Sequence, residues 1–223
     1  MRKYLQPSYF IDYQHPLVQK TVFQILKNNE TLSQNEKAVK LFYFVRDKIK
    51  YKIVIKNKKF SVKTLYWYNI KASKVLEAQQ GLCFPKAGLL VAMSRFINIP
   101  ARLHFVDIIN HLFPQELQKI IGGNHFFFHA YAELFLNNHW VKIAPTFDKD
   151  LSLKAGYPLV EFNGFDDALF PPFNSQGEKF IEYIKDRGVY ASFPYLNFSS
   201  ISLTKYYFFN KIKLRGSLQS KNV

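Results

Sequence analysis

The sequence predicts an α+β fold, in which helices pack on an antiparallel sheet, and three observations support this class. Residues 16–29 and 33–49 have the apolar spacing of amphipathic helices. The stretch after Cys83 is apolar nearly all round, which is typical of a central buried helix. Residues 125–148 combine strand-like alternation with turn residues, and this pattern indicates a β-hairpin.

The two N-terminal helices have recognisable start signals. Pro16 suits the first turn of the helix expected at 16–29. Ser33 and Glu36 have the spacing of a capping box, so the helix expected at 33–49 should begin beside Ser33. The apolar positions of this second helix recur at helical intervals: Ala38, Leu41, Phe42, Val45 and Ile49.

The segment between the second helix and the central helix is expected to be mixed. Residues 51–55, with the sequence YKIVI, favour a strand. Residues 57–72 are rich in lysine and aromatic residues and are expected to form a loop region. Ser73 is expected to be the N-cap of a short helix, SKVLEAQ, which Gly81 then interrupts.

The central helix is expected to begin at Cys83 and to end before Pro100. Pro85 fits its first turn, where the missing backbone N–H leaves no hydrogen bond unmade. Beyond Pro100, residues 102–109 alternate partly and favour a strand, and residues 110–124 are expected to form a loop or short helix.

A two-residue turn fixes the register of the expected hairpin. Asparagine tolerates the positive φ of tight primed turns, so the pair Asn137–Asn138 predicts the turn between the strands. With this loop, Phe135 faces Trp140. Glu133 faces Lys142, which would be a favourable cross-strand charge pair.

The first strand of the hairpin has two different faces. His129, Tyr131 and Glu133 share one face and make it the more polar one. The other face is expected to be entirely apolar: Phe126, Phe128, Ala130, Ala132, Leu134 and Leu136.

The C-terminal part of the chain is less regular. Residues 179–188, KFIEYIKDRG, are expected to form one short helix. No linker composition separates this part from the rest. We therefore expect a single domain over 1–223, with its core at about 33–150 and a C-terminal extension at about 151–223.

Composition excludes several classes of protein. The 223-residue chain is 48% hydrophobic and carries a net charge of +15, which indicates a globular basic protein. Its single cysteine excludes an intrachain disulfide and zinc sites built from two or four cysteines, and favours a reducing compartment such as the cytoplasm. No apolar run approaches the ~20 residues of a membrane-spanning helix, and the N-terminus lacks the apolar segment of a signal peptide.

The expected ligands are correspondingly few. The basic residues are scattered and accompany no nucleic-acid-binding motif, so a nucleic-acid partner is not expected. His125 and His129 share one strand face without an evident third ligand. The sequence thus implies neither a metal nor an organic cofactor.

Three side chains form a candidate catalytic site. Cys83 would lie at a helix N-terminus, where the helix dipole and unpaired N–H groups favour the thiolate. His129 would lie mid-strand, where a fixed imidazole could meet that sulfur. In a hairpin without a bulge at Pro145, His129 pairs with Thr146 and has Asp148 as a diagonal neighbour, within side-chain reach. Asp148 could then orient the imidazole and stabilise its protonated form.

The segments GLCFPKAGLLVAMSRFINIPAR and HAYAELFLNNHW, in this order, resemble the transglutaminase-like superfamily. Members have a papain-like core with a cysteine on a helix and a histidine and an aspartate on adjacent strands. The resemblance covers roughly 33–150 and places Cys83 at the nucleophile position and His129 at the histidine position. It implies acyl transfer or hydrolysis at an amide or thioester of a protein, a peptide or a small molecule.

The third catalytic position departs from the usual pattern of the superfamily. Most members have Asp-Pro-Thr after the tryptophan, whereas this chain has Ala144 before Pro145. A bacterial subgroup has Asn or Asp four residues further on, where this chain has Asp148. Three interpretations stay open: Asp148 replaces the missing carboxylate, the site is a Cys–His dyad, or activity has been lost. Gln80 is a candidate to complete an oxyanion hole with the Cys83 backbone N–H.

Two functions are therefore expected. The first is a cysteine-dependent transglutaminase-, protease- or deamidase-like enzyme that forms an acyl-enzyme on Cys83, with His129 as general base. The second is a catalytically weak or inactive fold that binds an acidic partner through its basic charge. Ala144 is the residue that favours this alternative.

Overall fold

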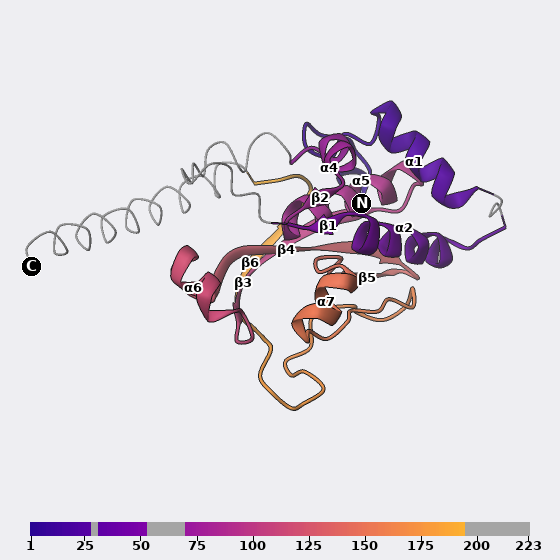
Figure 1. The fold of residues 1–223 in the computed structure, drawn as a ribbon. Coiled ribbons are helices and arrows are strands. Elements are labelled where there is room, and N and C mark those ends of the chain that lie inside the picture. The colour runs from indigo at the N-terminus through magenta and orange to yellow at the C-terminus, as the bar shows by residue number, and fades with distance from the viewer. Residues whose placement is uncertain (28–30, 53–69, 195–223) are drawn as a thin grey trace, which may run out of the picture.

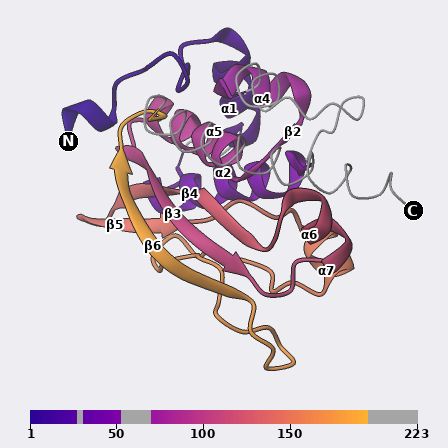
Figure 2. The ribbon, with the colours of Figure 1, turned by 90° about the vertical axis from the view of Figure 1, so that its left-hand side faces the viewer.

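The computed structural model describes residues 1–27, 31–52 and 70–194. Its centre is a four-stranded antiparallel sheet with the order β5-β4-β3-β6. The strands are β3 (Ala101–Asn110), β4 (His125–Leu136), β5 (His139–Ile143) and β6 (Ile181–Tyr190). The helices on one face are α1 (Pro16–Leu26), α2 (Gln34–Lys48), α4 (Ala72–Ala78) and α5 (Cys83–Phe96) (Figure 1). Both views place α7 (Lys149–Ala155) and the segment after it on the opposite side of the sheet (Figure 2). The chain is thus α+β, as predicted.

The first two helices begin where their start signals predict. Pro16 is the first residue of α1, which ends at Leu26, and residues 28–30 of the predicted helix lie outside the described part. The capping box of α2 is complete: the Glu36 N–H donates to Ser33 Oγ at 3.3 Å, and the Ser33 N–H donates to the Glu36 carboxylate at 2.9 Å.

The predicted N-cap of the short helix at 72–78 is wrong, because Lys71 occupies the N-cap position of α4 and makes no side-chain capping bond. Ser73 is the second residue of α4. Its N–H and its Oγ both donate to the carboxylate of Asp12, at 3.0 and 2.6 Å. The Asp12 carboxylate of the N-terminal segment thus accepts a backbone N–H that has no partner within the helix, and α4 begins before Ser73.

Helix α5 is the core of the structure. It begins at Cys83, as predicted, with Pro85 in its first turn, and its residues from Phe84 to Arg95 are buried. It packs against β3 and β4 on one side and against α2 and α4 on the other. A helix that is covered on all sides needs apolar residues all round, which is the pattern of its sequence.

Two short strands connect the helical layer to the start of α5. Strands β1 (Lys50–Tyr51) and β2 (Gln80–Gly81) pair in parallel, and Gly81 is followed by the N-cap residue Leu82. A side chain at Gly81 would approach the Cβ of Pro85 to 3.1 Å, so the tight entry into α5 favours glycine. Most of the strand predicted at 51–55, and nearly all of the loop predicted at 57–72, lie outside the described residues.

The hairpin has the predicted first strand, turn and register, but its second strand, β5, ends earlier than predicted. Asn137 and Asn138 form the turn, with φ values of 48° and 66°. Phe135 pairs with Trp140, and Glu133 pairs with Lys142. The pairing ends at Ile143, before Pro145, so the predicted pairing of His129 with Thr146 is not formed within β4 and β5.

A β-bulge interrupts the alternation of β4 just before His129. Val106 pairs with His129, and Ile108 pairs with Phe126, so one residue of β3 opposes two residues of β4. Phe128 has a φ of 55°, a left-handed conformation that a bulky residue rarely adopts. The prediction of a regular apolar face from Phe126 to Leu136 is therefore wrong at its beginning, because the bulge changes the phase of the alternation.

The helix predicted at 179–188 is also wrong, since residues Ile181–Tyr190 form strand β6 along the edge of β3. A short segment of mixed polarity is ambiguous on its own, and pairing with a neighbouring strand decides its structure. The segment expected to be a loop or short helix at 110–124 contains α6 (Gln115–Ile121), which ends at Gly122 with a φ of 89°.

Aromatic side chains connect the residues before α7 to the segment after it. Phe147, Tyr157, Phe170 and Phe180 form a chain of ring contacts with centroids 4.9–5.7 Å apart. Beside them, Ala168 covers the margin of β5: its N–H donates to the Lys142 carbonyl, and its carbonyl accepts from the Ala144 N–H. A short 3₁₀ helix, η1 (Arg2–Tyr4), packs at the other end of β5 through Tyr4 and Trp140.

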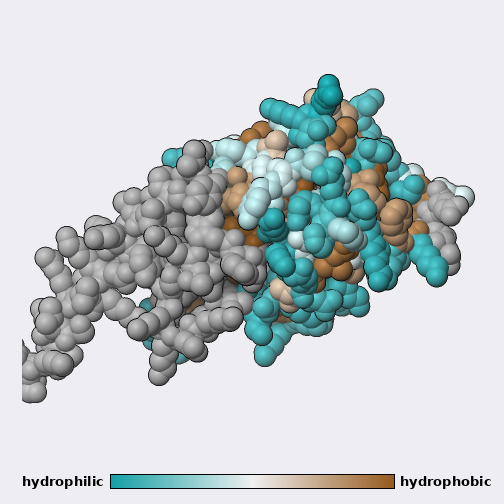
Figure 3. All heavy atoms as spheres, turned by 90° about the horizontal axis from the view of Figure 1, so that it is seen from above, coloured by the Kyte–Doolittle hydropathy of each residue, from teal (hydrophilic) through white to brown (hydrophobic). Residues whose placement is uncertain are grey.

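The surface seen from above is mixed, with apolar residues in separate patches among hydrophilic ones (Figure 3). In the part of the chain that the structure describes, every helix is too short or too polar to span a lipid bilayer.

Candidate active site

Cys83 is the first residue of α5, and its environment opposes ionisation. Burial raises the pKa of the thiol above its usual value. The backbone N–H groups of Ala130, Phe84 and Cys83 itself act in the opposite direction and favour the thiolate, as expected at a helix N-terminus. In this structure burial is the larger influence, so the resting sulfur is a protonated thiol.

His129 lies on β4 with only 4% of its surface exposed. Its ring packs against Phe170, with centroids 5.7 Å apart. Burial lowers the pKa of the imidazole to about 3, which keeps the ring neutral near pH 7. Its Nε2 is buried and has no hydrogen-bond partner within the described residues.

The structure brings Cys83 to the backbone beside His129. The Ala130 N–H that acts on the sulfur belongs to the peptide unit that joins His129 to Ala130. The packing of α5 on β4 therefore places the start of the helix at this point of the strand. Among the described residues, no hydrogen bond joins the two side chains, and in unliganded enzymes such contacts are often long.

Asp148 has a different set of partners from the one predicted. It is the N-cap of α7, where its Oδ1 accepts from the Leu151 N–H at 3.3 Å. Its Oδ2 accepts from the Tyr51 N–H at 2.9 Å, and the Lys50 ammonium lies 3.4 Å from Oδ1. Burial favours the neutral acid, but these N–H groups and the nearby lysines outweigh it and lower the pKa of Asp148. In the described part of the chain, this carboxylate makes no hydrogen bond to His129.

Two other sequence-predicted positions lie near the start of α5 and the end of β5. Ala144 is buried, and its N–H donates to the Ala168 carbonyl at 2.8 Å, so the backbone of the following segment covers the position. Gln80 is half-buried on β2, where it pairs with Lys50. Gln80 thus stands directly before the Gly81–Leu82 entry into the helix that Cys83 begins.

The charge partner predicted for Glu133 is wrong. Although Glu133 faces Lys142 in the register, its carboxylate bonds to Arg102 at 2.6 Å and to His104 Nδ1 at 2.5 Å. The Tyr131 hydroxyl lies 3.0 Å from the same ring nitrogen of His104. Arg102 and His104 belong to β3, and the hairpin pattern alone contains no information about that neighbour.

The sequence did not lead us to predict Lys86, a buried charged residue near Cys83. Lys86 follows Cys83 by three residues on α5 and is fully buried. Its ammonium group donates to the carbonyls of Arg46 and Ile49, at 2.9 and 2.5 Å. Burial lowers the pKa of Lys86 to about 7, against the opposite influence of Asp148 and Asp47. A lysine within an otherwise apolar helical run was the available signal.

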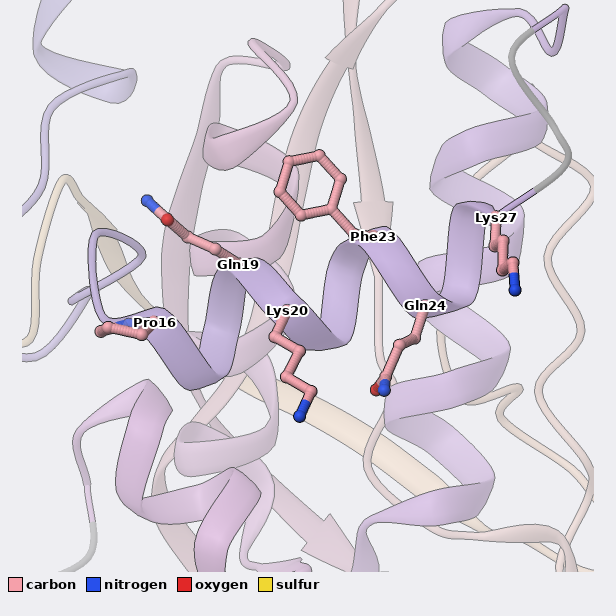
Figure 4. A pocket seen from close by; sticks show the side chains of 6 residues that line it. All are labelled: Pro16, Gln19, Lys20, Phe23, Gln24 and Lys27. Atoms are coloured by element: carbon pink, nitrogen blue, oxygen red, sulfur yellow. The ribbon is translucent and has the colours of Figure 1, made fainter.

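Two open pockets of the surface lie away from Cys83 and His129. One follows the outer side of α1 and is lined by Pro16, Gln19, Lys20, Phe23, Gln24 and Lys27. Phe23 projects away from Lys20 and Gln24 (Figure 4), and its ring contacts that of Phe96 at 5.3 Å. A second pocket lies between the end of α7 and residues 173–176. Within the described ranges, no group of three His, Cys, Asp or Glu side chains could hold a metal ion.

Comparisons with known proteins found one family and a few similar structures. The profile of the transglutaminase-like superfamily matches residues 19–145. Among solved structures, the chain is similar to one described as a "Putative Cysteine Protease from Cytophaga hutchinsonii", with 15% sequence identity and a TM-score of 0.44. The similarity covers 84% of this chain and 53% of that chain, so this chain spans about half the length of that protein. No curated protein matches the chain.

Proposed function

This chain belongs to the transglutaminase-like superfamily, and from that membership we propose that it is a cysteine-dependent acyltransferase or hydrolase acting on an amide or thioester. Cys83 is the nucleophile and His129 the general base. One observation carries the proposal. His129 Nε2 is buried without a hydrogen-bond partner among the described residues, and the peptide N–H that follows His129 acts on the Cys83 thiol. A buried polar atom without a hydrogen bond is costly, and a catalytic role is one of the reasons why such an atom is kept.

The uncharged resting state suggests when the reactive ion pair forms. A thiol with a raised pKa and an imidazole with a lowered pKa are both neutral near pH 7. Sγ and the imidazole therefore have to come into hydrogen-bond contact as an electrophile, whether an acyl donor or an alkylating reagent, reaches the sulfur. The thiol proton then moves to His129 as the sulfur attacks the carbonyl carbon.

The remaining steps follow from this proton transfer. The oxyanion of the tetrahedral intermediate forms beside the Cys83 N–H, which donates a hydrogen bond to it. We propose the Gln80 side-chain amide as the second hydrogen-bond donor. His129 returns the proton to the leaving amine, which leaves a thioester on Cys83. Water or an amine attacks the thioester while His129 accepts its proton, and the thiolate leaves and is reprotonated by His129.

We propose that the site works as a Cys–His dyad. Asp148 uses its oxygens for the backbone of Tyr51 and Leu151 and for Lys50, which supports an anchoring role. The prediction that Asp148 orients His129 stays a prediction, and the variant described in the Discussion distinguishes the two roles. We further propose that the whole chain is a single domain that acts in a reducing compartment, for which its single cysteine is suited.

Alkylation of the only cysteine tests the proposed function directly. At pH 7, iodoacetamide should alkylate Cys83 about tenfold faster in the folded wild type than in folded His129→Gln, because only the imidazole can take the thiol proton. Cys83→Ala is the blank for labelling. His139→Gln is the matched control, since this histidine lies exposed on β5. Equal alkylation rates for the wild type and His129→Gln would contradict the proposal that the protein is a cysteine-dependent enzyme.

The second candidate function is a binding module for an acidic partner. The net charge of +15, the raised pKa of Cys83 and the alanine at position 144 favour it. A module of this kind should bind a poly-glutamate peptide with an affinity that falls steeply as salt rises. Its Cys83→Ala variant should bind as tightly as the wild type. Unchanged affinity between low and high salt would contradict this alternative.

A further inference from the structure

An ion pair between a buried aspartate and a partly exposed arginine lies where the sheet is irregular. Asp107 of β3 is 2% exposed, and its two oxygens accept from Arg187 of β6, with Oδ2 at 2.5 Å from Nη2 and Oδ1 at 3.0 Å from Nε. The pairing of β3 changes register beside Asp107 toward both neighbours: between Val106 and Ile108 on the β4 side, and between Asp107 and Ile108 on the β6 side. One carboxylate thus marks an irregularity shared by three strands.

The same carboxylate holds the unusual backbone of β4. The Phe128 N–H donates to Asp107 Oδ1 at 3.1 Å. Phe128 has a φ of 55°, so its conformation is unfavourable unless its surroundings fix it. The Arg187 guanidinium also lies 5.0 Å from the centre of the Phe128 ring, within the range of a cation–π contact. Asp107 and Arg187 together therefore hold the bulge.

His129 is the residue that this bulge presents. It follows Phe128 directly and is the first residue of regular pairing, opposite Val106. A shift of one residue in a strand moves a side chain to the other face of the sheet. If the bulge were lost, His129 would turn from the side where Phe170 lies. Bulges next to functional sites often direct a side chain in this way.

We infer that Asp107, held by Arg187, is a positioning residue that directs the His129 imidazole through the bulge at Phe128. The inference rests on the proposed function, because His129 matters for catalysis only if it serves Cys83. It adds residues from two further strands, and neither of them contacts the reacting atoms.

The test compares Asp107→Ala and Asp107→Asn in the full chain. Two quantities are measured: the rate of Cys83 alkylation by iodoacetamide across pH, and the NMR signals of the His129 ring, assigned with His129→Gln. Asp107→Ala should slow alkylation about tenfold at pH 7 and should displace the ring signals, because the Phe128 N–H loses its acceptor. Asp107→Asn keeps an oxygen for that N–H, so it should stay within about threefold of the wild type.

Asp186→Asn is the matched control. Asp186 is also on β6 and also bonds to β3, through His104 at 2.9 Å, but it has no contact with Phe128 in the described structure. Its loss should weaken the packing of β6 and leave the alkylation rate and the His129 signals unchanged. Should Asp107→Ala fail to fold, Arg187→Lys serves instead and should give a smaller change in the same direction.

Two results would overturn the inference. The first is an Asp107→Ala variant whose His129 signals move no further than those of Asp186→Asn. The second is an Asp107→Ala variant that is alkylated as fast as the wild type although alkylation of the wild type depends on His129. If alkylation of the wild type is already independent of His129, the proposed function fails, and the ring signals alone then decide whether Asp107 positions the imidazole.

Discussion

Lys86 is a charged residue inside the most apolar helix of the structure. Its ammonium group bonds to two carbonyls at the C-terminal end of α2, where the helix dipole favours a positive charge. This stabilisation only partly offsets the loss of hydration, and the pKa of Lys86 falls to about 7. The residue therefore makes stability depend on pH in a range where few other groups titrate.

The sign of this dependence follows from the two pKa values. Lysine in an unfolded chain has a pKa of about 10.4, so between pH 7 and 10 the unfolded state binds more protons at this position than the folded state. The contribution of Lys86 to the free energy of unfolding should thus rise with pH through that range. Lys86→Met should remove this rise.

The measurement is urea unfolding of the wild type and Lys86→Met at several pH values. Between pH 7 and 10, the difference between the two free energies of unfolding should change by about 1 kcal/mol for each unit of pH. Using the difference cancels the titration of Cys83, whose raised pKa acts in the opposite direction. A difference that does not vary between pH 7 and 10 would contradict the prediction.

At the scale of the elements, Asp148 fastens α7 to β1. One oxygen caps the helix and the other accepts from the Tyr51 backbone. Asp148→Asn keeps a capping oxygen but loses the charge that attracts Lys50. We expect a loss of about 1 kcal/mol in the free energy of unfolding, with the Cys83 alkylation rate within twofold of the wild type.

Asp148→Ala removes both acceptors and should cost about 2–3 kcal/mol, because two N–H groups lose their partner. Thermal and urea unfolding measure both losses, and iodoacetamide labelling measures the rate. A tenfold slower alkylation of a folded Asp148→Asn protein would restore the role of orienting carboxylate to this residue and would exclude the dyad.

The elements differ in how far local sequence could predict them. The start of α5 at Cys83 and the bounds of β4 followed from apolar pattern, proline and asparagine, which act within a few residues. Strand β6 was missed because its structure depends on pairing with β3 far earlier in the chain. The bulge at Phe128 depends on Asp107 and Arg187, and no local pattern marks such a contact.

The same reasoning applies to the candidate site. Cys83 and His129 were identified from residue type, position and resemblance, and the packing of α5 on β4 agrees with their proposed proximity. The argument for Asp148 assumed a hairpin that continues past Ile143. Pro145 lacks a backbone N–H, and the chain turns there into the cap of α7 instead.

At the scale of the whole molecule, Arg95 joins three distant parts of the chain. It is 2% exposed and donates to the carbonyls of Gln6, Ala101 and Ala191, at 2.6–3.0 Å. Burial lowers its pKa to about 10, so it remains charged at neutral pH. The end of α5 is thereby bonded to the N-terminal segment, to the start of β3 and to the residue after β6.

Arg95→Met should leave three carbonyls without their donor and lower the free energy of unfolding by about 2–4 kcal/mol. Hydrogen exchange measured by mass spectrometry should accelerate around Gln6 and at the end of β6 before it accelerates in α5. Arg95→Lys, which keeps the charge but has fewer directed donors, should be intermediate. Hydrogen exchange that accelerates equally along the whole chain would contradict the proposal that Arg95 stabilises these segments locally.

The backbone around Ala168 has a bearing on how a polypeptide could approach. The N–H and carbonyl groups along the outer side of Lys142 and Ala144 are occupied by Asp167 and Ala168. A peptide in extended conformation therefore cannot pair with these backbone groups as an additional strand. A peptide substrate of the proposed enzyme is thus not expected to be held as an added strand at this margin of β5.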